Sequence, residues 1–313
     1  MKAMRGCTPN RPAATILAAG TALLFAALLA PAAAGQEVLR NDEDLDFDRP
    51  EAWAMKYFTS VSLMSGFGVP EARRPGSVEV DVELGWIPEL DDEQARVGFS
   101  GSKVEDVNKA PVFFRPRLVV GLPADFSLTF GYVPPVEAFD AQAHVFSLSL
   151  DRPLGRLGDW RFGGRLYGQV GEVRSDITCP NEVVGVTDPA LNPTGCEEES
   201  RDEVTMNYAG VELSAAWGPP EARWQPYASV AANHLDMEFQ VDALTNGLRD
   251  LSRLTADGWT WSAAAGVKVR HRSGIDLAVE AYYTPLEVDR ELDGSSENDA
   301  LFHLRALVGW RVD

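Results

Sequence analysis

Long apolar runs are missing from this chain once its first 34 residues are passed. No later stretch approaches the ~18 to 20 consecutive apolar residues that a membrane-spanning helix needs, so a helical inner-membrane protein is excluded. Basic residues are also few, because 28 Lys and Arg stand against 47 Asp and Glu and the formal net charge is −19. Such an acidic chain is a poor ligand for nucleic acid or for an anionic surface.

The first 34 residues have the organisation of a secretory signal peptide. Three basic residues come first, an apolar run from about Ile16 to Ala30 follows, and small residues precede an expected cut after Ala34. Such a peptide is removed after export and is not a membrane anchor. Its three basic residues would leave with it, so the formal net charge would change from −19 to −22 in a mature chain that begins at Gly35 or Gln36.

Cysteine is scarce, and the chain has three copies. Cys7 falls inside the predicted signal peptide, whereas Cys179 and Cys196 share one polar stretch without periodicity. We expect a disulfide between these two, because export favours oxidation. Closing so short a loop stabilises a protein by about 3 kcal/mol in the chain-entropy model. Two free thiols are the alternative.

Apolar and polar residues alternate in recurring stretches from residue 78 onward. In the first stretch Val80 and Val82 share one face while Glu79 and Asp81 share the other, and only a β-strand has this two-residue period. The strands are expected near 78–87, 112–122, 126–133, 142–150, 160–171, 204–217, 225–240, 259–270, 275–285 and 300–312. We therefore predict an all-β fold for residues 78–313, a closed antiparallel transmembrane β-barrel of ten strands, with twelve as the alternative.

The connections between these strands alternate in length. The short ones are 123–125, 151–159, 218–224 and 271–274, and the long ones are 88–111, 172–203, 241–258 and 286–299. Membrane barrels have short periplasmic turns and longer outer loops. We therefore expect both chain ends to lie on the periplasmic side.

Aromatic residues gather where the predicted strands end. The group expected at the periplasmic rim consists of Phe126, Trp160, Trp217, Trp224 and Trp310. The group expected at the outer rim consists of Trp86, Tyr132, Trp259, Trp261 and Tyr283. Two aromatic girdles are typical of a barrel that faces lipid, whereas a secreted β-sandwich, the competing fold, would need none.

Residues 35–77 form an acidic leader followed by an ambiguous segment. Asp48, Pro50 and Glu51 have the spacing of a helix start, but the residues from Trp53 to Leu63 also alternate as a strand would. We therefore expect residues 36–66 either to plug or line the barrel, from the lumen or the periplasmic side, or to add a strand in a twelve-stranded version. The aspartates at 42–48 lack the glycine and the bidentate glutamate of a calcium loop.

Polar side chains opposite the apolar face are expected to line the lumen. The set is Glu79, Asp81, Glu83, Arg115, Arg117, Arg161, Arg165, Tyr167, Gln169, Glu212, Lys268, Arg270, Asp276, Glu280, His303 and Arg305. Acidic and basic residues are segregated by strand, and the two rows either set up a field across a water-filled pore or pair and fill it. Because a ten-stranded barrel is narrow, we expect a largely filled or constricted lumen in preference to an open pore.

No catalytic residue, metal site or cofactor is predicted. His234, Asp236 and Glu238 could ligate a metal, but alternating polar residues are the ordinary lumen face of a barrel strand. His303 with Asp299 and a serine of the outer loop could be assembled into a hydrolase site, but nothing in the spacing requires it. We therefore expect no enzyme.

The closing strand alternates Phe302, Leu304, Ala306, Val308 and Trp310. Together with the predicted signal peptide and girdles, it makes the chain resemble the Gram-negative outer-membrane β-barrel proteins, a porin-like class within which no specific family is indicated. The resemblance implies an integral protein of the outer membrane whose partners are lipid and the barrel assembly machinery. Members usually end on an aromatic residue, whereas Trp310 is followed by three further residues.

Within that class the charged lumen favours porin-like passage of small polar solutes. The alternative is a surface structural or adhesion protein that acts through the acidic outer loops, above all the disulfide-tied loop 172–203. A lesser alternative is an outer-leaflet enzyme that modifies lipid or peptide.

Overall fold

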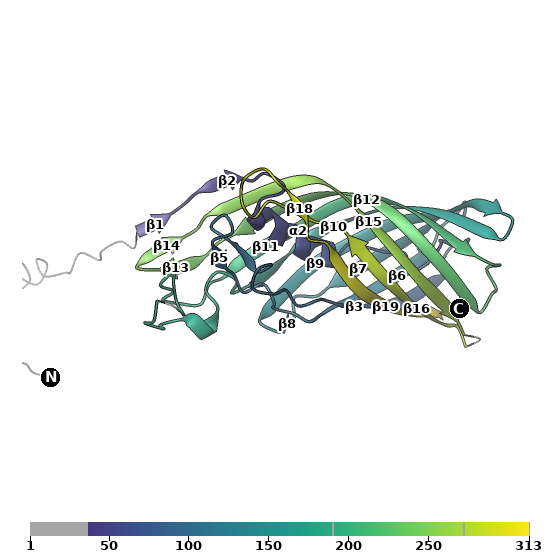
Figure 1. Cartoon of the computed structure of the whole chain (residues 1–313). Helices are drawn as coiled ribbons and strands as arrows, with labels where there is room; N and C mark the ends of the chain where they lie inside the picture. Colours follow the sequence, from purple (N-terminus) through teal and green to yellow (C-terminus); the bar gives the residue numbers. More distant parts are fainter. Residues whose placement is uncertain (1–36, 190, 272, 313) are drawn as a thin grey trace, which may run out of the picture. The chain divides into compact units, whose positions relative to one another are not determined.

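All ten expected strands form in the computed structural model, which describes residues 37–312 except 190 and 272. They are β3 (Val78–Trp86), β6 (Val112–Gly121), β7 (Ser127–Val133), β9 (Ala141–Leu157), β10 (Trp160–Ser175), β11 (Asp202–Trp217), β12 (Trp224–Gln240), β15 (Arg253–Arg270), β16 (Ile275–Thr284) and β19 (Leu301–Val312). Each pairs antiparallel with the next along the chain, and β19 pairs with β3, so the sheet closes (Figure 1). The ten-stranded barrel is confirmed, and the twelve-stranded alternative is wrong. The predicted signal peptide lies outside the described residues.

One predicted turn is wrong. Residues 151–157 continue β9, and only Gly158 and Asp159 separate it from β10. Pro153 and Gly155 interrupt the alternation in this part of the sequence, and a register shift between Phe162 and Gly163 accommodates them in the ladder. The hairpin therefore extends further than its apolar pattern suggests.

The outer face of the barrel is apolar and its inner face is charged. On β3, Val80 and Leu84 are 40% and 45% exposed, whereas Glu83, on the opposite face of the strand, is fully buried. The ten predicted girdle residues are exposed or half-buried, and Trp160 pairs with Trp217 beside the short turns. This surface suits contact with lipid. Among the described residues, no helix is long and apolar enough to cross a membrane.

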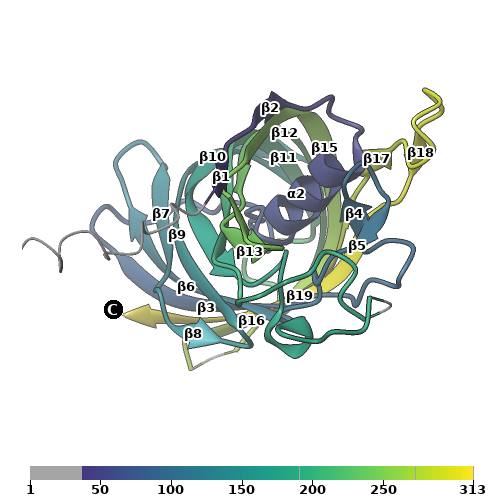
Figure 2. The same cartoon turned by 90° about the vertical axis from the view of Figure 1, so that its left-hand side faces the viewer.

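The segment before β3 runs through the inside of the barrel. β1 (Glu37–Leu39) and β2 (Asp42–Asp44) pair with β14 (Leu248–Asp250) and β15, at the end that carries the long loops. α2 (Pro50–Val61) then lies inside the ring of strands, as Figure 2 shows. The chain continues to the end with the short turns, where β3 begins. We call residues 45–77 the plug.

The prediction that both chain ends lie on the periplasmic side is wrong for the first residues that the structure describes, and residues 1–36 lie outside them. The end of β19 lies beside a short turn, where Arg311 N donates to Gly274 O (3.2 Å). By contrast, β2 lies beside residues 253–255 of β15, among the long loops. Loop lengths constrain only the strands of the sheet, and the plug crosses the lumen without joining that sheet.

An apolar core surrounds α2 in the half of the barrel nearer the long loops. Trp53, Met55 and Leu63 of the plug pack with wall residues such as Leu235 and Met237, and all five are at most 2% exposed. Full burial of one large apolar side chain contributes ~1.5 to 3 kcal/mol. This core therefore holds the helix inside the lumen.

The long loops carry short elements of their own. These are β4 (Arg96–Gly98), β5 (Lys103–Val104), β8 (Glu137–Ala138), η1 (Asn181–Val183), β13 (Ala243–Thr245), β17 (Glu287–Val288) and β18 (Glu297–Asn298). The expected disulfide joins Cys179 to Cys196, with Cα atoms 5.6 Å apart, and Cys196 forms a β-bridge with Thr245. The disulfide thus closes one outer loop on itself, and the β-bridge connects that loop to the next.

Candidate functional site: the plugged lumen and an outer pocket

The residues predicted to line the lumen all lie on wall strands. Apart from Lys268 and Arg270, which are partly buried, each is at most 7% exposed. Because water is excluded from nearly all of them, protein atoms occupy the lumen around these side chains. The plug contributes to this filling, because its backbone contacts Arg115, Arg117 and Arg305.

Three arginines of the wall bind the backbone at the end of α2, and we call them the arginine clamp. Arg305 donates from Nη1 to the carbonyl oxygen of Leu63 (2.5 Å). The other two contacts are Arg115 Nη1 to Ser62 O at 2.9 Å and Arg117 Nη1 to Ser65 O at 2.7 Å. These carbonyls follow Val61, the last residue of α2, and have no partner within the helix. The clamp therefore supplies donors to buried acceptors, and Ser62 O also accepts a hydrogen bond from Tyr208 Oη (3.0 Å).

Glu83 connects the members of the arginine clamp. Its Oε2 pairs with Arg115 Nη2 (2.7 Å) and with Arg117, and its Oε1 lies 3.9 Å from Arg305 Nη1. Asp81 interacts electrostatically with Arg117, and Glu280 does so with Arg305. The carbonyls at the carboxyl end of α2 carry the negative pole of the helix dipole, so the plug also attracts the positive charge of the clamp.

A second contact between wall and plug is centred on Arg165, which pairs with Asp151 and Glu212. Gly66 of the plug lies against this guanidinium, since a Cβ added at Gly66 would fall 1.9 Å from Arg165 Nη1. Sequence reasoning missed Asp151 because it placed this residue in a turn. The alternation of Ser147 and Ser149 with Asp151 was the signal that could have found it.

Glycines of the wall leave room for the plug at two further points. A Cβ added at Gly163 would lie 2.4 Å from Pro70 Cδ, and one added at Gly258 would lie 2.8 Å from the Phe47 ring. Neither glycine has the positive φ that would require glycine for backbone reasons. Their role is therefore to provide space for the plug.

The lumen is narrow near the short turns. Glu71 of the plug pairs with Arg270 (2.6 Å), and Arg73 pairs with Glu79 (2.8 Å). The cavity beside them has a volume of about 60 Å³. Wall charges are thus paired with the plug at this end as well.

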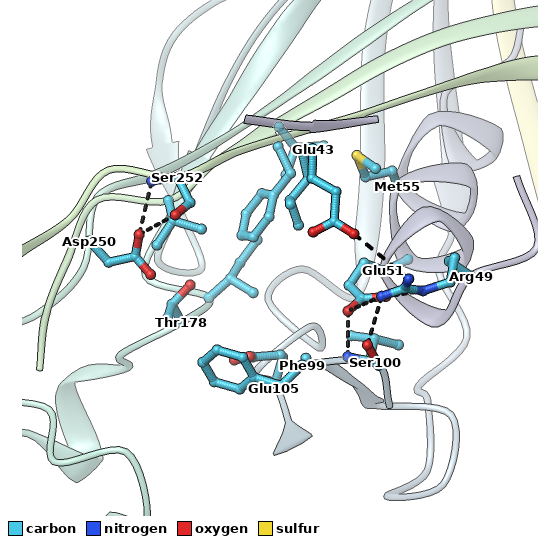
Figure 3. A pocket seen from close by; sticks show the side chains of 18 of the residues that line it. Glu43, Arg49, Glu51, Met55, Phe99, Ser100, Glu105, Thr178, Asp250 and Ser252 are labelled. Carbon is cyan, nitrogen blue, oxygen red and sulfur yellow. Dashed lines mark hydrogen bonds and ion pairs between the residues drawn. The ribbon is translucent and has the colours of Figure 1, made fainter. Parts of the chain in front are cut away.

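A larger cavity of about 450 Å³ lies at the end with the long loops, and we call it the outer pocket. Figure 3 shows Met55 of α2 and Glu43 of β2 on its upper side, and Phe99 of the loop between β3 and β6 on its lower side. Asp250 and its partner Ser252 lie at the far side from α2. Residues distant in sequence meet here because β2 and the plug pass between the loops.

The start of α2 fixes the loop that forms one side of the outer pocket. Glu51 Oε1 accepts a hydrogen bond from Ser100 N (2.5 Å), and Arg49 Nη2 donates to Ser100 Oγ (2.7 Å). Phe99 and Ser100 both have positive φ, at 48° and 59°, a region that residues other than glycine seldom occupy. These contacts hold the Phe99 side chain at the rim, where it is 65% exposed.

Glu105 is a largely buried carboxyl group of the outer pocket, with its side chain 11% exposed. Lys103 Nζ pairs with its Oε2 at 2.8 Å. Burial nevertheless raises the pKa of Glu105 from its ordinary 4.5 to about 7, because desolvation of the charged form outweighs the attraction of Lys103. This outer-loop carboxyl thus changes its charge near neutral pH.

The other side chains weighed from the sequence do not come together in the ways considered. His303 is buried in the lumen, where its Nε2 accepts from Arg305 Nε (2.8 Å), whereas Asp299 pairs with Arg290 (2.7 Å). His234 lies 3.6 Å from Asp257. Within residues 37–312, leaving aside 190 and 272, no group of three or more His, Cys, Asp or Glu could hold a metal ion.

Comparison with known proteins finds similarity at the level of solved structures. No family model and no curated protein matches the chain. The N-terminal β-barrel domain of Pseudomonas aeruginosa OprF is similar at 10% identity, covering 77% of this chain and 100% of that one with a TM-score of 0.30. Ail, the attachment invasion locus protein of Yersinia pestis, is similar at 12% identity, covering 76% of this chain and 99% of that one with a TM-score of 0.29. The outer membrane protease OmpT of Escherichia coli is similar at 9% identity, covering 76% of this chain and 94% of that one with a TM-score of 0.36.

The closed sheet with an apolar outer face and tryptophans at its rims decides the class of this protein. It is a Gram-negative outer-membrane β-barrel protein. The long loops accordingly face outward and the short turns face the periplasm. At identities this low, the roles named for the similar proteins do not transfer to this barrel.

Proposed function

We propose that this barrel is a gated, porin-like passage for small polar solutes that is closed at rest by its plug. The single observation that carries the proposal is the arginine clamp, in which charged wall side chains hold the plug through its backbone. A charged wall that binds a segment of the same chain can exchange those contacts for contacts with water.

The chemistry of the wall supports a second, water-filled state. Replacing buried ion pairs by well-packed apolar residues is often neutral or stabilising, so charges are not needed merely to hold a permanent plug. Yet the lumen retains Glu83 with its arginines and Arg165 with its two carboxylates. Such a surface would be hydrated without large cost once the plug moved.

Conductance across planar lipid bilayers tests this proposal. The native protein is expected to be silent apart from rare openings, and Arg305→Gln should raise the open probability about tenfold or more, because it removes a charged hydrogen bond to the plug. Arg174→Gln is the matched control, since Arg174 is 58% exposed and pairs with Glu172 and Glu203, outside the plug.

A cysteine staple provides the opposite perturbation. Phe47→Cys with Gly258→Cys joins the plug to β15 at a point where a Cβ on residue 258 lies 2.9 Å from Phe47 Cγ, compatible with the ~3.5 to 4.5 Å between disulfide Cβ atoms. The oxidised staple should abolish openings, and reduction should restore them. A steady current through the native protein, or a folded Arg305→Gln variant as silent as the native one, would contradict the proposal.

A further inference from the structure

We propose that the outer pocket binds a compact amphiphilic organic cation, that is, a molecule with an apolar body and one ammonium group. Such binding takes place among the outer loops and needs no movement of the plug. The inference therefore goes beyond the proposed passage and stands or falls separately from it.

The walls of the outer pocket suit an apolar body. Its apolar lining includes Met55 and Phe58 of α2, Phe239 of β12, Leu254 of β15 and Val107 of the loop between β3 and β6. The volume of about 450 Å³ falls within the roughly 300 to 1,000 Å³ of small-molecule sites, which are mostly apolar with a few placed polar groups. The pocket could enclose an aromatic ring or a short hydrocarbon chain.

The charged residues that line the pocket determine which ligand charge is favoured. Four lining residues are acidic, namely Glu43, Glu51, Glu105 and Asp250, whereas Arg49 is the one basic residue among those that line the pocket in the described part of the chain. Arg49 is shared, since it lies 3.8 Å from Glu43 and 3.5 Å from Glu51. Apolar walls strengthen the resulting negative field, so a cation is attracted and an anion repelled.

Two carboxylates at the pocket retain capacity to accept a hydrogen bond. Glu51 Oε2 is buried and accepts no hydrogen bond, although Arg49 Nε lies 3.5 Å from it. Lys103 bonds to Oε2 of Glu105, and the other oxygen, Oε1, lies beside Gly98, where a Cβ would come within 2.1 Å of it. An ammonium group has three donors for such acceptors, and the exposed Phe99 ring at the rim offers a cation–π contact (Figure 3).

Calorimetric titration of the full chain in lipid nanodiscs tests the site with three probes of similar shape. They are 2-phenylethylammonium, 2-phenylethanol and 3-phenylpropionate, which differ in charge. The cation should bind about tenfold or more tightly than the neutral alcohol, as expected for charge-assisted hydrogen bonds, and the anion should bind most weakly. No binding of the cation, or anion binding of equal strength, overturns the proposal.

Variants locate the binding. At pH 8, where Glu105 is mostly charged, Glu105→Gln should weaken binding of the cation about tenfold and leave that of the alcohol unchanged. Glu198→Gln, the same charge change at a half-exposed carboxylate outside the pocket, should leave both unchanged. An equal loss from Glu198→Gln overturns the site.

A variant whose outer pocket is filled by a larger side chain is the second, independent test. Ala54→Phe places a ring in the pocket from α2 and should abolish binding of both probes, with Leu254→Trp in its place if heat-modifiable migration shows that Ala54→Phe does not fold. Unchanged binding by a folded, filled variant overturns the proposal. Conductance plays no part in either arm, so failure of the passage and failure of this site are distinguishable.

Discussion

Gly258 of β15 lies directly against the ring of Phe47, and a Cβ added at this glycine would come within 2.8 Å of Phe47 Cδ2. The contact joins the wall to the plug near the outer end of the lumen. We expect Gly258→Ala to destabilise the protein by about 1 to 3 kcal/mol, because the added methyl group overlaps the ring. The urea midpoint of the detergent-solubilised protein, followed by tryptophan fluorescence, measures the change.

A double substitution is the control for that contact. Adding Phe47→Ala to Gly258→Ala removes the ring that the methyl group meets, so the double variant should lose less stability than the sum of the two single variants. Strictly additive losses would mean that the glycine is needed for some other reason.

Glu83→Gln should be among the most damaging single changes in the barrel. It leaves three buried guanidinium groups without their shared carboxylate, and removing one partner of a buried ion pair costs about 3 to 5 kcal/mol. Glu203→Gln removes the same charge from a pair whose arginine is 58% exposed and should cost about 1 kcal/mol or less. Equal midpoints for the two variants in a urea titration would refute the role given to Glu83.

The elevated pKa of Glu105 predicts a dependence of stability on pH. The folded protein holds the proton at a pKa of about 7, against an ordinary value of 4.5, so its stabilising contribution is full below about pH 4.5 and is lost as the pH rises through about 7. Relative to Glu105→Gln, the native protein should therefore lose about 1 to 3 kcal/mol between about pH 5 and pH 8. A native protein that gains stability over this interval, relative to the variant, would show the opposite sign.

The Cys179–Cys196 disulfide closes a loop over a sequence separation of 17. Replacing both residues by serine should free the outer loop. The free energy of unfolding should fall by about 3 kcal/mol, because the disulfide no longer constrains the unfolded chain, while the barrel keeps its heat-modifiable migration. Protease added outside protein-containing vesicles should then cut between residues 180 and 195. Native protein alkylated without reduction is the control, and equal resistance of both samples would argue that other contacts hold the loop.

The barrel strands were predictable because lipid and lumen impose opposite chemistry on alternate residues. Val80, Glu83 and Leu84 follow that contrast within one short strand. The contrast weakens beyond the apolar band, which is why residues 151–157 were taken for a turn although they continue β9.

The plug helix could not be distinguished from a strand because it has almost no solvent-facing side. Wall strands surround α2, so Met55 is buried as fully as Trp53 and Tyr57, although these two share one helical face and Met55 lies on another. A helical period is readable only where one face is polar. The sequence therefore could not decide whether residues 36–66 plug or line the barrel or add a strand to it.

The arginine clamp and the outer pocket could not be predicted from the sequence, for different reasons. The lumen position of Arg115 and Arg305 followed from strand alternation, but their acceptors on the plug are backbone carbonyls, which leave no mark in a sequence. The outer pocket combines Glu43, Phe99 and Phe239 from segments far apart in the chain, and only the course of the plug brings them together.

That course has a consequence for how the protein is assembled in the membrane. β2 is paired with β15 among the outer loops, whereas β3 starts at the periplasmic rim, so the polypeptide is threaded through its own ring. Inserting the plug through a closed and narrow barrel is harder than closing the barrel around the plug. We therefore expect β3 and β19 to pair last, with the plug already in place as the template for barrel closure.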